Sequence, residues 1–580
     1  MDKPNLTSDI RIASFAGKGI SGIILRIIGP LLDRLLGLSA MRKFYESHNI
    51  SGLKKRPFIK AVFQYKNIRM TGVDELLALI PKEGPLIVTC NHPLGGLDGM
   101  ALLYALSEKR KDVVALTNVG LSIFKELGDF FIFTNPLNRG AASNSKSLRS
   151  CVKHLNNNGV LLLFPASRVS FYQHQSHMVT DGEWNKLLSF LARRKNTPVL
   201  PVFIGSKNSP FFYNMGRIYY RFRLMLLTRE FMKSNNMTID LHAGELVNPQ
   251  LFDSQFDDTQ NTAFMRVLTQ LQAPEYDRSW KSVDEKQKLF QSVAAPVEQD
   301  NLEKEIFNLP KEQHLLDYRE YSVWYGYQRQ MPQVVHEIAR LRELVFRELE
   351  EGSGEPVDTD KFDASYTHLF VYDTKQKALL GAYRMGQTDV LQKEGGLSSV
   401  YLSQMFVFED SFVNQQQPCL EMGRSFIAPE YQKKHFSLHL LWKAIGAFVI
   451  KHPRYTTLYG TVSLSRTYDP RSVALISQML LPKRQQDVSA RYPFVNPLQN
   501  DIQSHLENHH HDFSALSALV KMLEHDHKDL PILLKHYFRL NAQFHCIGLD
   551  PNFVFTPGLL LSVDLNKIPA KQAKLYLNGS

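Results

Sequence analysis

The chain has 580 residues, of which 44% are hydrophobic and 22% charged. This length and composition indicate a globular protein of more than one domain and exclude disordered, fibrous and repeat architectures. The net charge of +11 comes from the first half, because residues 1–280 contain 35 Lys and Arg against 22 Asp and Glu, whereas the remainder contains 33 against 35. A basic surface suits nucleic acid or an anionic membrane. No zinc-finger spacing, RNP-like block or basic helical tract is present, so we predict no nucleic-acid partner and favour a lipid surface.

Residues 1–50 are predicted to form an amphipathic segment at a membrane interface. Within them, residues 19–37 are rich in Leu and Ile, but charged residues interrupt the run and Pro30 breaks it. The stretch is therefore a poor transmembrane span, and no small-residue cleavage site of a signal peptide follows it. We expect peripheral attachment to the inner, cytoplasmic face of the cell membrane. The alternative is an ordinary helix packed on its own domain.

The cysteines and histidines indicate a reducing compartment and no metal. The four cysteines show neither paired spacing nor a Cys-x-x-Cys motif; they are Cys90, Cys151, Cys419 and Cys546. Disulfides are therefore not expected. The triplet His509–His511 cannot converge on one ion from a helix or a strand, so we predict a solvated loop there and no metal site.

The most informative stretch is residues 88–99, together with the apolar run Pro85 to Val88 that leads into it. An apolar run predicts a buried strand that ends at Asn91-His92, and a Gly-rich turn, Asp98 and a helical pattern follow. A histidine at a strand end with a carboxylate a few residues further on is typical of a general base and the group that orients it. The alternative is a strand-end histidine beside an aspartate that caps the next helix.

Two further apolar strands are predicted over residues 160–164 and 198–204. The first is followed by the turn Pro165-Ala166-Ser167-Arg168-Val169-Ser170. Strands that alternate with polar turns and helices indicate α/β organisation. Sheets of this kind place their chemistry in the turns after the strands.

Residues 60–250 resemble the glycerolipid acyltransferase family of the lysophosphatidic acid acyltransferase type. That family has a His-x4-Asp block, a Phe-Pro-Glu-Gly-Thr-Arg-Ser-like block and a Val-Pro-Val block in this order. Here five residues separate His92 from Asp98, and the second block lacks its acidic residue, which suggests an acceptor other than lysophosphatidic acid. The resemblance implies that His92 takes a hydroxyl proton and Asp98 orients it. It also implies that Ser167 and Arg168 contact the donor or the developing oxyanion.

A polar linker is predicted over residues 281–319 and a second domain over residues 320–580. A helical pattern starts at Val334, two strands follow, and a third strand leads through a polar turn into an apolar helix that starts at Ser437. A helix N-terminus after a strand can hold a phosphate. The turn Gln432–Ser437 contains no glycine, which favours the single phosphate of a carrier-protein arm over a tightly held pyrophosphate. A surface helix start is the alternative.

Residues 320–565 are similar to the hemolysin-like, ornithine N-acyltransferase branch of the GCN5-related N-acetyltransferase (GNAT) fold. The matching positions are Arg342, Arg347, Asp363, His368 and the blocks 381–384, 420–425, 441–445, 459–463 and 530–535. Together the two halves resemble the bifunctional bacterial ornithine lipid synthases. The resemblance implies two α/β domains, each a central mixed sheet flanked by helices: a glycerolipid-acyltransferase-like O-acyltransferase domain over 51–280, followed by the GNAT-like domain.

The expected function is the synthesis of an acyl-oxyacyl amino acid lipid. The second half would N-acylate an amino acid with a 3-hydroxyacyl chain, and the first half would then acylate the new hydroxyl. Ornithine is the favoured head group, with glycine, serine-glycine and lysine as alternatives. The expected donor and partner is acyl carrier protein carrying the acyl thioester, with acyl-CoA as the alternative, and no tightly bound cofactor is expected.

In the second half, Glu421 is the expected acceptor of the ammonium proton. Arg424 would bind a substrate carboxylate or the carrier phosphate, and Arg384 is expected to contact substrate as well. Two alternatives stay open. One is a structural ion pair between Glu421 and Arg424, which would move the active site to Asp363, His368 and Arg384. The other is a single-activity lysophospholipid acyltransferase whose second half only docks a carrier protein.

Overall fold

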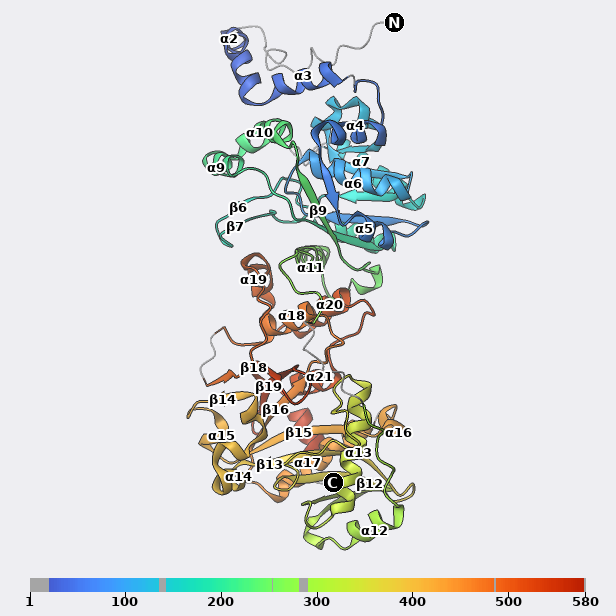
Figure 1. Cartoon of the computed structure of the whole chain (residues 1–580), viewed down its shortest axis with the longest axis vertical. Helices are drawn as coiled ribbons and strands as arrows, with labels where there is room; N and C mark the ends of the chain where they lie inside the picture. The colour runs from blue at the N-terminus through green and yellow to red at the C-terminus, as the bar shows by residue number, and fades with distance from the viewer. Residues whose placement is uncertain are drawn as a thin grey trace. The chain divides into compact units, whose positions relative to one another are not determined.

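The computed structural model describes residues 20–48, 50–134, 142–252, 254–280, 290–434, 436–483 and 487–577. It divides into two compact units (Figure 1). The first unit comprises residues 1–276, 498–509 and 514–529, and the second comprises residues 277–497, 510–513 and 530–580. Each contains one large sheet flanked by helices, which confirms the α/β, two-domain prediction.

The first unit is built on a seven-stranded mixed sheet in the order β1-β9-β8-β2-β5-β3-β4. All neighbouring strands are parallel except β8 and β9. The strands are β1 (Arg69–Thr71), β2 (Leu86–Cys90), β3 (Val113–Asn118), β4 (Phe131–Thr134), β5 (Val160–Leu163), β8 (Val199–Ile204) and β9 (Thr238–Ala243), and β6 (Phe171–Gln173) and β7 (Met178–Thr180) form a separate hairpin. Every residue of β2 and β5 is buried, because parallel strands are covered on both faces, and this explains their continuous apolar runs.

The first unit also contains helices. They are α2 (Ile20–Leu35), α3 (Leu38–His48), α4 (Arg56–Lys66), α5 (Val73–Leu79), α6 (Gly96–Lys109), α7 (Ala142–Asn156), α8 (Leu187–Arg194), α9 (Pro210–Ile218), α10 (Tyr220–Lys233), α11 (Asp258–Gln270), α19 (Asn500–Leu506) and α20 (Phe513–Leu523). In the part of the chain that the structure describes, no helix is both long enough and apolar enough to cross a membrane. Helix α2 lies in the predicted amphipathic segment, whose residues 1–19 lie outside the described residues.

The second unit contains an eight-stranded sheet in the order β10-β11-β12-β13-β15-β16-β19-β18. Only β15 and β16 run parallel. Its strands are β10 (His314–Tyr318), β11 (Tyr321–Gly326), β12 (Thr367–Asp373), β13 (Ala378–Gln387), β15 (Cys419–Ile427), β16 (Thr457–Ser463), β18 (Gln543–Asp550) and β19 (Thr556–Asp564), and β14 (Phe406–Phe408) pairs with β17 (Val488–Ala490). The helices are α12 (Gln299–Phe307), α13 (Pro332–Glu348), α14 (Thr388–Gly395), α15 (Val413–Gln416), α16 (Pro429–Gln432), α17 (Ser437–Lys451), α18 (Pro470–Leu480), α21 (Ile532–Arg539) and α22 (Ala570–Tyr576).

The longest segment of the first unit ends at residue 276, four residues before the expected domain boundary at residue 280. The expected linker, 281–319, is only partly a linker, because α12 and β10 lie within it; residues 281–289 lie outside the described residues. A larger difference concerns residues 498–509 and 514–529, which sequence analysis assigned to the second domain but which belong to the first unit.

A buried ion pair holds this C-terminal segment in the first unit. The guanidinium of Arg266 on α11 lies 2.9 and 3.1 Å from the two carboxylate oxygens of Asp501 on α19. Thr180 donates a hydrogen bond of 2.9 Å to the same carboxylate. Arg266 also donates to the backbone carbonyl of Asp181, at 2.8 Å. The segment therefore completes the unit's interior.

We expect Asp501→Ala to destabilise the first unit by about 3–5 kcal/mol, because it leaves the Arg266 guanidinium buried without a counter-charge. Hydrogen exchange of the full chain, followed by mass spectrometry, should show lost protection in β7 and α11. The control is Asp526→Asn, which removes an exposed carboxylate 3.3 Å from Lys528 and should change stability by less than about 1 kcal/mol. Equal protection in the two variants would contradict a structural role for Asp501.

Candidate active sites

The first candidate site starts where β2 ends. Asn91 follows the strand, and its side-chain amide donates to the backbone carbonyl of Ile204 at 3.0 Å while its oxygen accepts from the Ile204 amide at 2.7 Å. This two-way bond fixes the ends of β2 and β8 to each other. His92 therefore leaves the sheet in a fixed direction.

His92 and Asp98 form the pair that the sequence predicts. The Nδ1 atom of His92 lies 2.9 Å from Oδ2 of Asp98, which is fully buried. The same oxygen accepts hydrogen bonds from the backbone amides of Leu94 at 2.9 Å and Gly95 at 3.0 Å. Burial raises the pKa of Asp98, although the hydrogen bonds from His92 and these amides oppose the shift. Gly95 has a φ of 77°, and an added Cβ would lie 2.9 Å from Leu227, so this glycine turn accommodates the extra residue between His92 and Asp98.

The two interpretations of Asp98 are compatible in the structure. Gly95 is the N-cap of α6, and Asp98 is the third helical residue, where its side chain accepts from the N-cap amide. The carboxylate thus caps the helix and binds His92 at the same time. With Nδ1 bound to Asp98, Nε2 of His92 has no hydrogen-bond partner among the described residues, and the imidazole is 18% exposed. Nε2 is therefore able to take a proton from a bound hydroxyl.

Asp181 and Ser170 also position His92, and sequence analysis assigned them no role. The backbone amide of His92 donates to Asp181 at 3.2 Å, and the Ser170 amide donates to the His92 carbonyl at 2.8 Å. Asp181 also accepts hydrogen bonds from the Ser170 hydroxyl at 2.5 Å and from Trp184 at 3.0 Å. Ser170 lies in the predicted turn block, but Asp181 is 89 positions from His92, and no local pattern marks it.

Ser167 and Arg168 follow β5 and are exposed. Ser167 has a φ of 57°, so the turn is sharp. Burial, and then the proximity of Arg168, lower the pKa of Arg223 on α10. Among the described residues neither arginine has a carboxylate partner, so this turn presents unpaired positive charge.

The second candidate site lies where two parallel strands separate. The strands β15 and β16 pair only from Cys419 to Met422 and from Thr457 to Gly460. On the other side of β15, the register with β13 shifts between Gly423 and Phe426, which is a β-bulge. Arg424 sits in this bulge with a φ of 50° and a side chain only 9% exposed.

Three arginines and three aspartates form one buried network at the bulge. Asp363 lies 3.0 Å from Arg342 and 3.2 Å from Arg384. Burial raises the pKa of Asp363, but these two guanidinium groups outweigh it and hold the pKa far below its usual value. Arg384 also pairs with Asp360 at 2.6 Å, and Arg424 lies 3.3 Å from both Asp358 and Asp360.

Glu421 belongs to the second candidate site, and hydrogen bonds rather than an ion pair hold its carboxylate among the described residues. Its carboxylate accepts hydrogen bonds from the Tyr366 hydroxyl at 2.6 Å and from the backbone amide of Leu402 at 3.0 Å. Burial raises the pKa of Glu421 to about 7. Within the described chain, Arg424 pairs with aspartates and not with Glu421, so the structural ion pair between Glu421 and Arg424 does not form. Burial lowers the pKa of His368 to about 4, which keeps this imidazole neutral.

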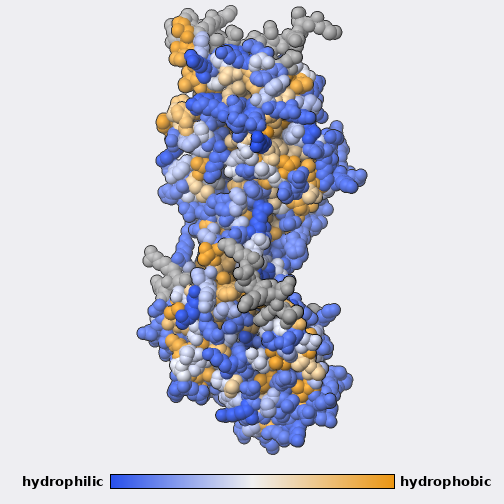
Figure 2. Space-filling view, viewed as in Figure 1, coloured by the Kyte–Doolittle hydropathy of each residue, from blue (hydrophilic) through white to orange (hydrophobic). Residues whose placement is uncertain are grey.

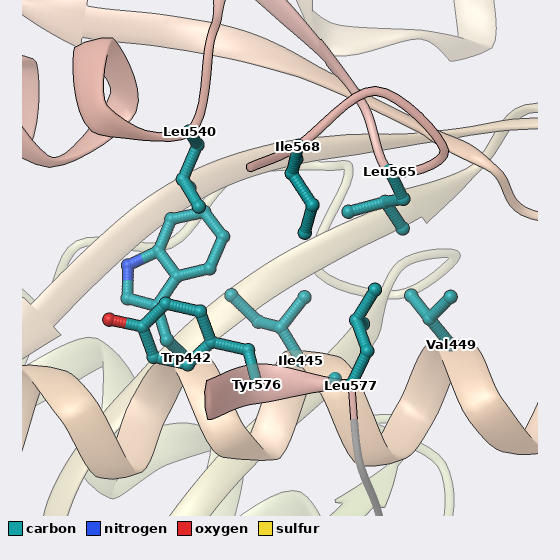
Figure 3. Close-up of a pocket in the computed structure, with 9 residues that line it drawn as sticks. Trp442, Ile445, Val449, Leu540, Leu565, Ile568, Tyr576 and Leu577 are labelled. Atoms are coloured by element: carbon teal, nitrogen blue, oxygen red, sulfur yellow. The ribbon is translucent and has the colours of Figure 1, made fainter. Parts of the chain in front are cut away.

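The turn before α17 carries two lysines. Lys433 and Lys434 are exposed, and Lys434 lies over the ring of Tyr431 at 4.4 Å; His435 lies outside the described residues. Further along, an apolar pocket lies between α17 and α22 (Figure 3). Trp442, Ile445 and Val449 of α17 point across it toward residues that include Leu540 and Leu565.

One group of possible metal ligands occurs among the described residues, formed by Glu524, His525 and Asp526. The ammonium of Lys528 lies 3.2 Å from Glu524 and 3.3 Å from Asp526. A protein cation therefore already balances these carboxylates.

Comparison with known proteins gives each unit a class. Residues 39–234 match an acyltransferase family model, and residues 341–443 match a model of the acetyltransferase (GNAT) domain. A glycine N(alpha)-acyltransferase of Bacteroides thetaiotaomicron is 29% identical over 254 residues, which is 40% of this chain and 74% of that protein. A lyso-glycine lipid O-acyltransferase of the same organism is 26% identical over 220 residues, 36% of this chain and 78% of that protein. An L-ornithine N(alpha)-acyltransferase of Brucella abortus is 32% identical over 100 residues, 16% of this chain and 34% of that protein.

The chain is therefore an acyltransferase with an acyltransferase domain followed by a GNAT domain. This order of domains agrees with its resemblance to the bifunctional amino acid lipid synthases.

We expect Asp98→Asn to slow acyl transfer by the first unit by at least about 100-fold, the usual contribution of an acid–base group. Asparagine keeps the shape of the side chain but loses the charge that stabilises the imidazolium. The rate is measured as thiol release from an acyl thioester with a hydroxylated acceptor. Asp129→Asn, which changes an exposed aspartate in the same unit, should keep the wild-type rate. A wild-type rate in Asp98→Asn would disprove the orienting role.

Proposed function

We propose that this protein makes an acyl-oxyacyl amino acid lipid in two acyl transfers. The GNAT unit would join a 3-hydroxyacyl chain to the α-amino group of an amino acid, and the first unit would esterify the new hydroxyl. The observation that carries the proposal is the His92–Asp98 pair with its unoccupied Nε2, in a chain that also contains a GNAT domain. The names of the relatives, which act on glycine, lyso-glycine lipid and ornithine, support both steps.

In the proposed O-acylation, Nε2 of His92 takes the proton of the 3-hydroxyl as its oxygen attacks the thioester carbonyl. The carbon–sulfur bond then breaks, and the imidazolium gives that proton to the leaving thiolate. Asp98 holds the imidazole through Nδ1 and stabilises its charged form. Ser167 and Arg168 follow the neighbouring strand, where they would face the donor or the oxyanion. The unpaired charge of Arg168 and Arg223 suits the carboxylate of an N-acyl amino acid.

In the proposed N-acylation, the amine attacks the thioester directly, so no nucleophilic side chain is required. Arg424 or Arg384 would orient the carboxylate of the amino acid through the network at the bulge. The glycine-free, lysine-bearing turn before α17 favours acyl carrier protein as the donor. Acyl-CoA is the alternative donor.

We also propose that the first unit binds the membrane surface through α2 and the α9–α10 hairpin. Exposed apolar side chains gather on these helices, including Leu31 at 70%, Ile218 at 74% and Leu224 at 54% (Figure 2). Leu36 and Phe212 share one buried cluster, so the end of α2 and the hairpin pack together. Arginines 217 and 221 add positive charge, which suits anionic lipid.

The lipid products test the main proposal. Expression of the full chain in a bacterium that lacks aminolipids should yield a diacylated aminolipid that fragments to glycine or ornithine in mass spectrometry. His92→Ala should abolish the ester and let the mono-acylated lipid accumulate, because the amide is formed at the other site. If only phosphatidic acid changes, the protein is a glycerolipid acyltransferase whose second half docks a carrier protein.

Vesicle binding tests the membrane surface. Ile218→Glu with Leu224→Glu should weaken sedimentation with anionic vesicles by about tenfold or more, since each buried aliphatic side chain contributes about 1.5–3 kcal/mol. Ile532→Glu is the control, because Ile532 is 73% exposed but lies in the second unit. Equal binding by both variants would place the membrane contact elsewhere.

A further inference from the structure

Glu351 is a buried carboxylate that none of the roles above uses. It lies three residues beyond the end of α13 and is 4% exposed. The hydroxyl of Ser463 donates a hydrogen bond of 3.1 Å to its Oε2 atom. Its other oxygen, Oε1, is buried and accepts no hydrogen bond from the described residues. A buried carboxylate oxygen without a donor is costly and calls for an explanation.

The position of Glu351 connects it to the point where β15 and β16 separate. Ser463 is the last residue of β16, three positions beyond Gly460, where the pairing with β15 ends. Ser463 is exposed, so the residue that binds Glu351 reaches the surface of the unit. Arg424 lies two positions beyond the end of pairing on the other strand, and its charge acts on Glu351.

The charges around Arg424 favour a cationic substrate group. Six carboxyl groups and three guanidinium groups gather here: Asp358, Asp360, Asp363, Glu351, Glu421 and Asp550 with Arg342, Arg384 and Arg424. Burial raises the pKa of three of the carboxyl groups, namely Glu351, Glu421 and Asp550. Among the residues that the structure describes, no guanidinium lies within ion-pair distance of these three, so an incoming ammonium would supply the missing positive charge.

Of these three carboxyl groups, Glu351 alone has an oxygen without a hydrogen-bond donor in the described part of the chain. Glu421 is bound by Tyr366 and Leu402, as described above. Asp550 accepts from the Tyr401 hydroxyl at 2.8 Å and from the backbone amide of Asn552 at 2.9 Å. Oε1 of Glu351 is the remaining acceptor.

We propose that Glu351 binds the α-ammonium of the amino acid substrate and accepts its proton, an inference that rests on the proposed N-acylation. The ammonium gives one proton to Oε1 and becomes a neutral amine. The amine nitrogen then bonds to the thioester carbonyl carbon, and the carbon–sulfur bond breaks. The thiolate leaves and takes up the second nitrogen proton, and Glu351 returns its proton to solvent past Ser463.

This role fixes the pH dependence of N-acylation. Burial raises the pKa of Glu351 to about 7; the hydrogen bond from Ser463 and the charge of Arg424 oppose that shift, and Asp550 adds to it. Only the ionised carboxylate accepts a proton, so the rate should rise as the pH increases through about 7. Ser463→Ala removes a hydrogen bond that lowers this pKa, and the rise should therefore move to higher pH.

The experiment measures N-acylation by the full chain against pH, with 3-hydroxyacyl carrier protein and glycine or ornithine. Glu351→Gln should lower the rate at pH 8 by at least about 100-fold and remove the rise near pH 7. Glu350→Gln, at the exposed neighbouring position, should keep the wild-type profile. A circular dichroism melt of each variant identifies loss of folding.

The outcomes separate the two proposals. No N-acyl product from the wild type would refute the proposed function itself. A wild-type product together with an unchanged profile in Glu351→Gln would refute the role of Glu351. Loss of the rise in Glu421→Gln alone would assign the proton to Glu421, and an unshifted profile in Ser463→Ala would also count against Glu351. If Glu351→Gln does not fold, the shift in Ser463→Ala decides.

Discussion

The first unit depends on the buried ion pair between Arg266 and Asp501. Both side chains are about 5% exposed, and charges in such a setting are tolerated only when they are paired and hydrogen-bonded. The pair connects to His92 through Asp181, because Arg266 donates to the backbone carbonyl of Asp181, whose carboxylate accepts from the amide of His92. Asp501 therefore belongs to the support of the first site, although 235 positions separate it from Arg266. A cut between the two sequence halves would separate Asp501 from Arg266, so we expect the first unit to lose stability without this C-terminal segment.

The two candidate sites differ in how their buried carboxylates are stabilised. At the first, a single carboxylate, Asp98, is satisfied by a histidine and two backbone amides, so one ring nitrogen stays available. At the second, the aspartates around Asp363 balance three guanidinium groups, and the carboxyl groups without such partners have raised pKa values. This difference matches the proposed acceptors. A hydroxyl loses its proton during attack, whereas an ammonium must lose its proton beforehand.

Short sequence patterns predicted the features of this fold that are formed by neighbouring residues. The strands at 86–90, 160–163 and 199–204 and the helix from Ser437 follow from apolar runs and turn residues, and the His92–Asp98 pair follows from spacing within one turn. Asp181, Asp501 and Glu351 act through partners far away in the sequence, so no window of neighbouring residues marks them. The Gly-rich turn before Asp98 was visible in the sequence, and the structure shows why it contains glycine: Gly95 has a positive φ and lies close to Leu227. The bulge in β15 brings Arg424 into the same network as Asp363. No sequence pattern predicts this bulge.

The proposed order of reactions explains why the first unit would act at a membrane surface. The amide product carries one acyl chain, a carboxylate and a free hydroxyl, so it is an amphiphile that would partition to a membrane surface. The first unit exposes apolar side chains on its helices. Arg168 and Arg223, which have no carboxylate partner among the described residues, lie close to each other, and this combination would suit a carboxylate-headed lipid at that surface. Joining both activities in one chain keeps the intermediate at a high effective concentration near the second reaction. Because the two halves are one chain, a segment of the C-terminal half also packs in the first unit. The single chain would therefore both hold the intermediate near the second reaction and stabilise the first unit.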